Sequence, residues 1–146
     1  MFFALVTIAV VAGSSAVYVY FFLPQTLTSA ETARRLNSIY SRAVGILDFM
    51  SDDMKELVDR NITATMFSTR MDDLKGDMLA VKADLTELKK VPFPTYVESI
   101  NLLDRGLQAY GDAIDYAHDL NFNQTSVYLE QGTEYVNRSK VALPTS

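Results

Sequence analysis

Apolar side chains recur at alternating steps of three and four residues along most of the chain after residue 30. This spacing keeps them on one face of a helix, the face that packs against a neighbouring helix at a shallow angle, while charged residues fill the positions between. The period of two that marks a strand is absent, so the pattern predicts an all-α protein. The two most regular runs are Ala33, Leu36, Tyr40, Ala43, Leu47, Met50, Met54 and Leu57, and then Ala64, Phe67, Met71, Leu74, Met78, Val81, Leu85 and Leu88.

A third run follows Pro94, and a fourth, shorter run has a more aromatic face. Val91-Pro92-Phe93-Pro94 cannot continue a helix, and Asn121-Phe122-Asn123 is typical of a turn whose Asn caps the next helix. We therefore expect a helical bundle over residues 24–146, with helices at about 27–59, 62–90, 95–120 and 124–142. The third run is Tyr96, Ile100, Leu103, Leu107, Tyr110, Ile114 and Ala117; the fourth is Tyr128, Gly132, Tyr135, Ser139 and Ala142.

The segment between the first two runs leaves two architectures open. Residues 57–64 contain no Gly or Pro, and the three-and-four spacing of the apolar residues continues through Asn61. Residues 27–90 could therefore form one continuous helix, a long coiled-coil stalk, followed by a helical hairpin. A turn at Asp59-Arg60-Asn61 would instead close an up-down four-helix bundle. We favour the turn, because it buries two complete apolar faces against each other.

The first 23 residues contain no charged side chain. A helix of that length spans about 34 Å, enough for a hydrocarbon core of about 30 Å. A cleaved signal peptide fits less well, because no Lys or Arg precedes the apolar run and no A-x-A site closes it. We expect a single N-terminal transmembrane helix over residues 1–23, with a face of small residues for packing on other membrane helices: Ala9, Ala12, Gly13 and Ala16.

Composition excludes several classes of protein. The chain has no cysteine, so it has neither disulfides nor thiolate chemistry. Its net charge of -5 argues against nucleic acid as a partner, and an acidic domain gains nothing from anionic lipid headgroups.

Two signals for membrane orientation disagree. The three N-x-S/T sequons, at Asn61, Asn123 and Asn137, are candidate glycosylation sites and would place the helical domain outside the cytoplasm. Positive residues that follow the apolar segment, beginning with Arg34 and Arg35, favour a cytoplasmic domain. We favour the outward-facing arrangement, because long domains weaken the charge rule.

Three residue types deserve a chemical test. Asp115-x-x-His118 has the spacing of half a di-iron site, but His118 is the only histidine, which favours a solvated or capping role. The pairs Asp52-Asp53 and Asp72-Asp73 lack the spacing of a calcium loop. Five methionines are Cu(I) candidates by composition, but most occupy the apolar face, where Met fills core gaps: Met50, Met54, Met66, Met71 and Met78.

No nucleophile paired with a base, phosphate loop or metal spacing is present in the sequence, so we expect no enzyme activity and no cofactor. The leading hypothesis is an accessory or structural subunit of a larger membrane assembly. Its partners would be the lipid bilayer and other integral subunits, and a homo-oligomer remains open. The host is also left open among an oxidoreductase, a monooxygenase, a transporter and a surface-layer complex.

Two family resemblances define the alternatives. An anchor helix that runs into a helical bundle looks like the sensor domain of bacterial chemoreceptors, which implies a ligand site; its candidate lining residues are Tyr96, Tyr110, Tyr128 and Tyr135. Those receptors return through the membrane, and this sequence shows no second apolar segment. The apolar N-terminus with Pro24 is similar to processed type IV pilins, which implies a filament subunit, but Leu5 stands where pilins carry a glutamate.

Overall fold

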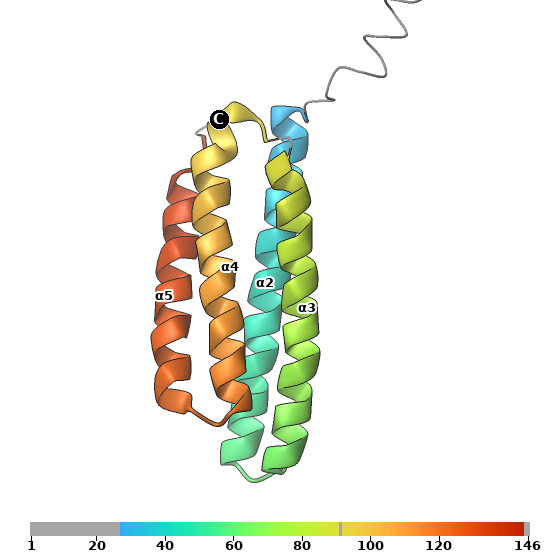
Figure 1. Cartoon of the computed structure of the whole chain (residues 1–146), viewed down its shortest axis with the longest axis vertical. Helices are drawn as coiled ribbons and strands as arrows, with labels where there is room; N and C mark the ends of the chain where they lie inside the picture. The colour runs from blue at the N-terminus through green and yellow to red at the C-terminus, as the bar shows by residue number, and fades with distance from the viewer. Residues whose placement is uncertain (1–26, 91, 145–146) are drawn as a thin grey trace, which may run out of the picture.

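The computed structural model describes residues 27–90 and 92–144, and within them the chain is helical with no strand (Figure 1). The four main helices are α2 (Ser29–Val58), α3 (Ala64–Lys90), α4 (Val97–His118) and α5 (Phe122–Val141). A short 3-10 turn, η1 (Pro94–Tyr96), precedes α4. The all-helical prediction is confirmed, and the expectation of a helical bundle with it.

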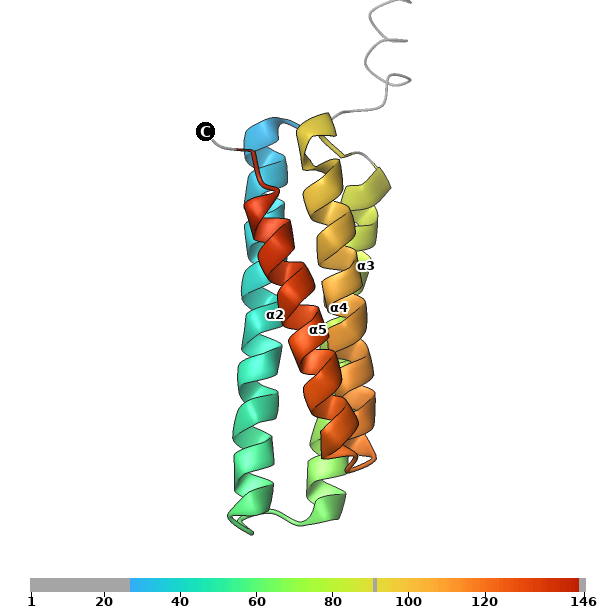
Figure 2. The ribbon, with the colours of Figure 1, turned by 90° about the vertical axis from the view of Figure 1, so that its left-hand side faces the viewer.

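Consecutive helices run in opposite directions, as Figures 1 and 2 both show. The start of α2, the α3–α4 connection and the end of α5 lie at one end of the bundle, which we call the near end. The turns that join α2 to α3 and α4 to α5 lie at the opposite end, which we call the far end. The α2–α3 hairpin extends further than the α4–α5 hairpin at the far end (Figure 1).

Local sequence explains where the helices start and stop. The Thr28 side chain accepts a hydrogen bond from the backbone N–H of Glu31, and Asn121 caps α5 through Gln124 in the same way. The sequence predicts that an Asn of the 121–123 turn caps a helix beginning at about residue 124; Asn121 is the cap, and α5 begins two residues earlier, at Phe122. Both far-end turns also need a left-handed residue, at Arg60 (φ 60°) and Leu120 (φ 58°).

The α2–α3 turn decides between the two architectures left open by the sequence. α2 ends at Val58, α3 begins at Ala64, and Asn61 is exposed on the turn between them. The hairpin is therefore confirmed over this segment, and the continuous stalk is wrong. Ile62, within the turn, is buried and belongs to the core.

The bundle core follows the predicted period closely in α3 and α4. Every position of the second run after Ala64 is buried, as is every position of the third run. The first run is only partly buried, since Leu47, Met54 and Leu57 contact the core without being enclosed by it. Leu47 was expected to be buried on this face, and its partial exposure corrects that expectation. Figure 2 shows that α5 slants across the bundle, near α2 at the near end and away from it toward the far end.

The core face of α5 also differs from the prediction. Its buried residues are Thr125, Gly132, Val136 and Ser139, whereas Tyr128 and Tyr135 are only half-buried. The cause is the close approach of α5 to α4 at two glycines. A Cβ on Gly106 would lie 3.2 Å from the carbonyl oxygen of Gly132 and 2.7 Å from Cγ2 of Val136. An aromatic face has no room there.

In the ranges 27–90 and 92–144, no helix is both long and apolar enough to cross a bilayer. The expected transmembrane segment, residues 1–23, lies outside the described residues, as do the small residues on its proposed packing face: Ala9, Ala12, Gly13 and Ala16.

Candidate functional site

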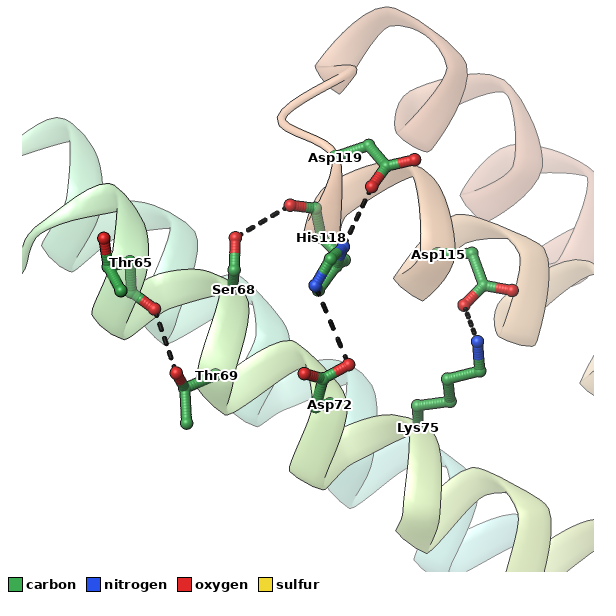
Figure 3. A network of polar contacts seen from close by, with 8 residues as sticks. All are labelled: Thr65, Ser68, Thr69, Asp72, Lys75, Asp115, His118 and Asp119. Carbon is green, nitrogen blue, oxygen red and sulfur yellow. Dashed lines mark hydrogen bonds and ion pairs between the residues drawn. The ribbon is translucent and has the colours of Figure 1, made fainter.

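The single histidine lies in a polar cleft between the far halves of α3 and α4 (Figure 3). His118 is the last residue of α4, and its Nδ1 lies 2.9 Å from a carboxylate oxygen of Asp119. Its Nε2 lies 3.7 Å from Asp72 of α3. Ser68 of α3 donates a hydrogen bond of 2.9 Å to the backbone carbonyl of His118. These contacts tie the end of α4 to α3, as expected for a histidine at a helix terminus.

Charges around the cleft raise the pKa of His118. The hydrogen bond to Asp119 is the main cause, and the negative charges of Asp72 and Asp119 add to it; desolvation and the Lys75 ammonium oppose the shift. The ammonium of Lys75 is 2.6 Å from Asp115, and this hydrogen bond raises the pKa of Lys75. When His118 is protonated, each charged group in the cleft therefore has an oppositely charged neighbour.

The cleft does not assemble the half di-iron site that the Asp115-x-x-His118 spacing suggested. Asp115 pairs with Lys75, whereas His118 turns to Asp119 and Asp72 (Figure 3). Throughout the part of the chain that the structure describes, no group of three or more His, Cys, Asp or Glu side chains is arranged to hold a metal ion.

The methionines serve the core rather than a shared site. Met50, Met71 and Met78 are almost fully buried, each with 1% exposure or less, Met54 is half-buried, and Met66 is 49% exposed on the surface. The prediction that most of them fill the core is confirmed.

The aspartate pairs lie on solvated faces, with one exception that stabilises the hairpin. Arg70 of α3 donates hydrogen bonds to Asp53 (2.5 Å) and Glu56 (2.7 Å) of α2. These bonds raise the pKa of Arg70. Asp52, Asp72 and Asp73 are exposed.

The four tyrosines proposed to line a ligand pocket lie in separate packing environments. Tyr96 packs edge-on against Phe93, and the buried Tyr110 ring faces Gly132. Tyr128 stacks on Tyr116 with ring centroids 5.2 Å apart. Tyr135 lies between two guanidinium groups, with Arg138 at 5.9 Å and Arg105 at 6.0 Å from its centroid. They do not line one cavity.

A buried polar cluster joins three helices, and the sequence analysis missed it. The Tyr40 hydroxyl of α2 bonds Ser139 of α5 and lies 3.4 Å from Ser99 of α4. Ser139 Oγ also donates a 2.6 Å hydrogen bond to the Ser99 carbonyl. Tyr40 and Ser139 were recognised only as seam positions. The available signal was a hydroxyl at a predicted core position in each of two runs, Tyr40 and Ser139, whereas Ser99 lies outside the predicted third run.

The surface carries an exposed aromatic residue that sequence reasoning also passed over. Phe49 is 65% exposed and lines a groove between α2 and α3. Gly45 and Ile46 form its α2 side together with Arg42, and Asp77 and Val81 form its α3 side. Phe49 falls between the predicted core positions and is a large apolar residue where a polar one was expected.

The candidate glycosylation residues are all exposed. Asn61 lies on the α2–α3 turn, Asn123 is the second residue of α5, and Asn137 lies within α5 nearer the near end. The structure does not bring them together. Asn137 borders a groove lined by Leu102 of α4 and Val141 of α5.

Comparison of the chain with protein-family models, with curated proteins and with solved structures gives no match in any of the three.

Proposed function

We propose that this protein is a non-catalytic, single-pass accessory subunit of a multi-subunit membrane complex, with its helical domain outside the cytoplasm. One observation carries the proposal: an uncharged apolar segment of 23 residues leads almost directly into a packed helical bundle. Such a segment is long enough to span a bilayer, and a bundle with its own core can extend from it as a domain.

The interior of the bundle is organised for packing. Among the described residues, every buried side-chain nitrogen or oxygen has a hydrogen-bond partner. The aromatic residues that a ligand site would use lie in separate packing arrangements, such as Tyr110 against Gly132. These observations favour a structural role over the ligand-binding alternative.

The surface offers a contact point for another subunit. Aromatic residues and Arg are enriched at protein–protein interfaces relative to the rest of the surface. Phe49 and Arg42 line the same groove, and Phe49 is exposed. We assign this groove as the contact of the helical domain with its host complex.

The outward orientation rests on the sequons. Asn61 and Asn123 lie at or beside far-end turns, where a bulky glycan has space. Asn137 sits within a helix and is exposed, so a glycan there would project from the side of the bundle. If these residues are modified in the cell, intact-mass analysis of the purified chain will show the added sugar.

The test is gentle solubilisation of the native membrane followed by identification of the proteins that co-purify in fixed ratio with the tagged chain. We expect a constant set of integral membrane proteins that is lost from Phe49→Ala and retained in Leu79→Ala. Leu79 is the matched control because it is another exposed apolar residue, 58% accessible, away from the Phe49 groove.

Each other outcome identifies a competing function. A chain that migrates as a monomer would favour the ligand-binding bundle, and a homopolymer would favour a filament subunit. A constant set of partners that is unaffected by Phe49→Ala would retain the accessory role and reject this groove as the contact.

A further inference from the structure

The charged residues are distributed unevenly along the axis of the bundle. Contacts between helices define the two halves: Lys82 with Gln108 and Tyr110 with Thr133 lie on the near side of the middle, and Lys75 with Asp115 lies on the far side. Contacts between α2 and α3 extend the same division, because Arg42 pairs with Asp84 and Asp53 with Arg70.

The two halves have opposite net charge. The near half, residues 27–46, 78–110 and 133–144, contains nine Lys and Arg and six Asp and Glu. The far half, residues 47–77 and 111–132, contains four Lys and Arg and twelve Asp and Glu. The net charge of -5 for the whole chain therefore hides a near half with a net charge of +3.

A surface that meets the near end responds to this local charge. α2 has 30 residues and is about 45 Å long, whereas the Debye length at physiological salt is about 8 Å. The acidic far half is several Debye lengths away and is screened. The argument from net charge, that the domain gains nothing from anionic lipids, therefore does not apply to the near end.

The near end also carries exposed apolar side chains. Val141 at the end of α5 is 87% exposed and Val97 at the start of α4 is 41% exposed. Phe93, in the α3–α4 connection, and Leu143 are only partly buried. Around them stand cations in the last turns of two helices, among them Lys89 and Lys90 of α3 and Arg138 and Lys140 of α5. Long cationic side chains with apolar residues beside them suit a lipid headgroup layer.

Chain length fixes what this end can meet. Residues 24–28 link the apolar segment to α2, and five residues reach at most about 17 Å. If residues 1–23 span a bilayer, the start of α2 stays within about 17 Å of the hydrocarbon boundary, so the near end is the end of the bundle that faces the headgroups. The start of α2, the α3–α4 connection and the end of α5 all lie on this side (Figures 1 and 2).

We propose that the near end of the bundle docks on anionic lipid headgroups, with Val141 and Val97 at the apolar boundary and the surrounding Lys and Arg on the phosphates. This inference rests on the membrane anchor in the proposed function and is independent of which side of the membrane the bundle occupies. It adds that the helical domain sits on the bilayer with its acidic end pointing away from it.

Two matched cysteine variants of the full chain test the proposal. The protein has no cysteine of its own, so Val141→Cys and Val58→Cys each accept one environment-sensitive fluorophore. Both valines are highly exposed, 87% and 77%, but Val141 lies at the near end and Val58 at the far end. The chain is reconstituted in phosphatidylcholine vesicles with and without phosphatidylserine, and quenching by spin-labelled lipid is measured.

We expect quenching at Val141 to exceed quenching at Val58, to rise about twofold or more with phosphatidylserine, and to fall at high salt. Lys90→Glu with Lys140→Glu should reduce the Val141 signal. Lys55→Glu with Arg60→Glu, the far-end control, should leave it unchanged. Circular dichroism checks that each variant is folded. If a charge variant does not fold, the salt dependence of quenching at Val141 still tests the proposal, because it is measured on the labelled chain with its native charges.

Equal quenching at both positions, or a Val141 signal indifferent to phosphatidylserine and salt, would overturn the docking proposal. A Val141 label that is shielded only when native partner subunits are present would assign this end to a protein contact instead. Flotation of the vesicles distinguishes a failure of the membrane anchor from a failure of the docking proposal. A chain that does not float contradicts the anchor itself, whereas a chain that floats with Val141 in water contradicts only the docking.

Discussion

At the scale of single residues, the closest helix–helix contact depends on the absence of a side chain. A methyl group on Gly132 would overlap the ring of Tyr110 and lie 3.2 Å from the carbonyl oxygen of Gly106. We expect Gly132→Ala to lower the free energy of unfolding by about 1–3 kcal/mol, because α4 and α5 must separate to admit it. Urea unfolding of the full chain in mild detergent, followed by circular dichroism, measures the change.

Gly76→Ala is the control for this substitution. Gly76 lies in the middle of α3, and a Cβ built there meets nothing within 4 Å. Alanine should therefore stabilise the protein by about 0.5–1 kcal/mol through helix propensity alone. A Gly132→Ala variant as stable as the native chain would mean that α4 and α5 are further apart than described.

His118 gives a second prediction at this scale, on pH. Its pKa is raised above the ordinary value, mainly by the hydrogen bond to Asp119. A group with a raised folded-state pKa contributes stability that is complete below its unfolded pKa, about 6.5, and that is lost as pH rises through the folded pKa. Relative to His118→Gln, the native chain should therefore lose stability as pH rises above about 6.5.

The histidine can be titrated directly by NMR, because the chain has only one. Asp119→Asn should bring the pKa of His118 down toward the ordinary value. Asp73→Asn should change it less, because Asp73 is next to Asp72 in sequence but is not among the groups that raise this pKa. The prediction is wrong if the native pKa lies at or below 6.5, or if Asp119→Asn leaves it unmoved.

At the scale of helices, a buried hydroxyl cluster sets how α2, α4 and α5 meet. Tyr40→Phe would remove the hydroxyl that bonds Ser139, in a site where Ser99 and Ser139 are both fully buried. We expect a loss of about 1–2 kcal/mol in unfolding free energy. Tyr135→Phe is the control, because Tyr135 is half-buried and its ring lies within 6.0 Å of two arginine guanidinium groups, outside the hydroxyl cluster. It should change stability by less than about 0.5 kcal/mol. Equal effects would remove the special role of the cluster.

The helices themselves follow from periodicity and breakers, and this is why the sequence predicts them well. In α3 and α4 each apolar step of three or four lands on a buried residue, and the turn at 59–63 occupies the expected place. The tilt of α5 has no such signal, because it arises from contact between Gly106 and Gly132, which lie on different helices. The same tilt explains both errors: the exposure of Leu47 and the assignment of Tyr128 and Tyr135 to the core.

The two helices of the α2–α3 hairpin bury their apolar residues to different degrees, and this difference gives a prediction on stability. Leu74 on α3 is buried at 7% exposure, whereas Leu47 on α2 is half-buried. Leu74→Ala should lower the unfolding free energy by about 2–5 kcal/mol, and Leu47→Ala should cost clearly less because part of its surface is already in water. Thermal or urea unfolding of both variants decides the order. A larger loss for Leu47→Ala would mean that something covers α2 there.

Some of the candidate sites could be predicted from the sequence, and others could not. Asparagine sequons and the lone histidine are visible in the sequence, and the structure places them on the surface or at a helix end. The Phe49 groove and the charge difference between the two ends need the folded chain, because each combines residues from helices distant in sequence. Net charge in particular is an average that carries no information on position.

At the scale of the whole molecule, the proposed function makes a prediction on topology: the bundle lies outside the cytoplasm. The exposed sequons favour the outside, whereas Arg34 and Arg35 near the apolar segment favour the cytoplasm. The single-cysteine variant at Val58 measures the orientation, because this residue is 77% exposed beside the far-end turn. A membrane-impermeant maleimide added to intact cells should label Val58→Cys fully if the domain faces outward.

The native chain, which has no cysteine, gives the background. Labelling that appears only after the membrane is permeabilised would reverse the orientation, rule out use of the three sequons, and show that the positive charges near the apolar segment outweigh the length of the domain that follows them.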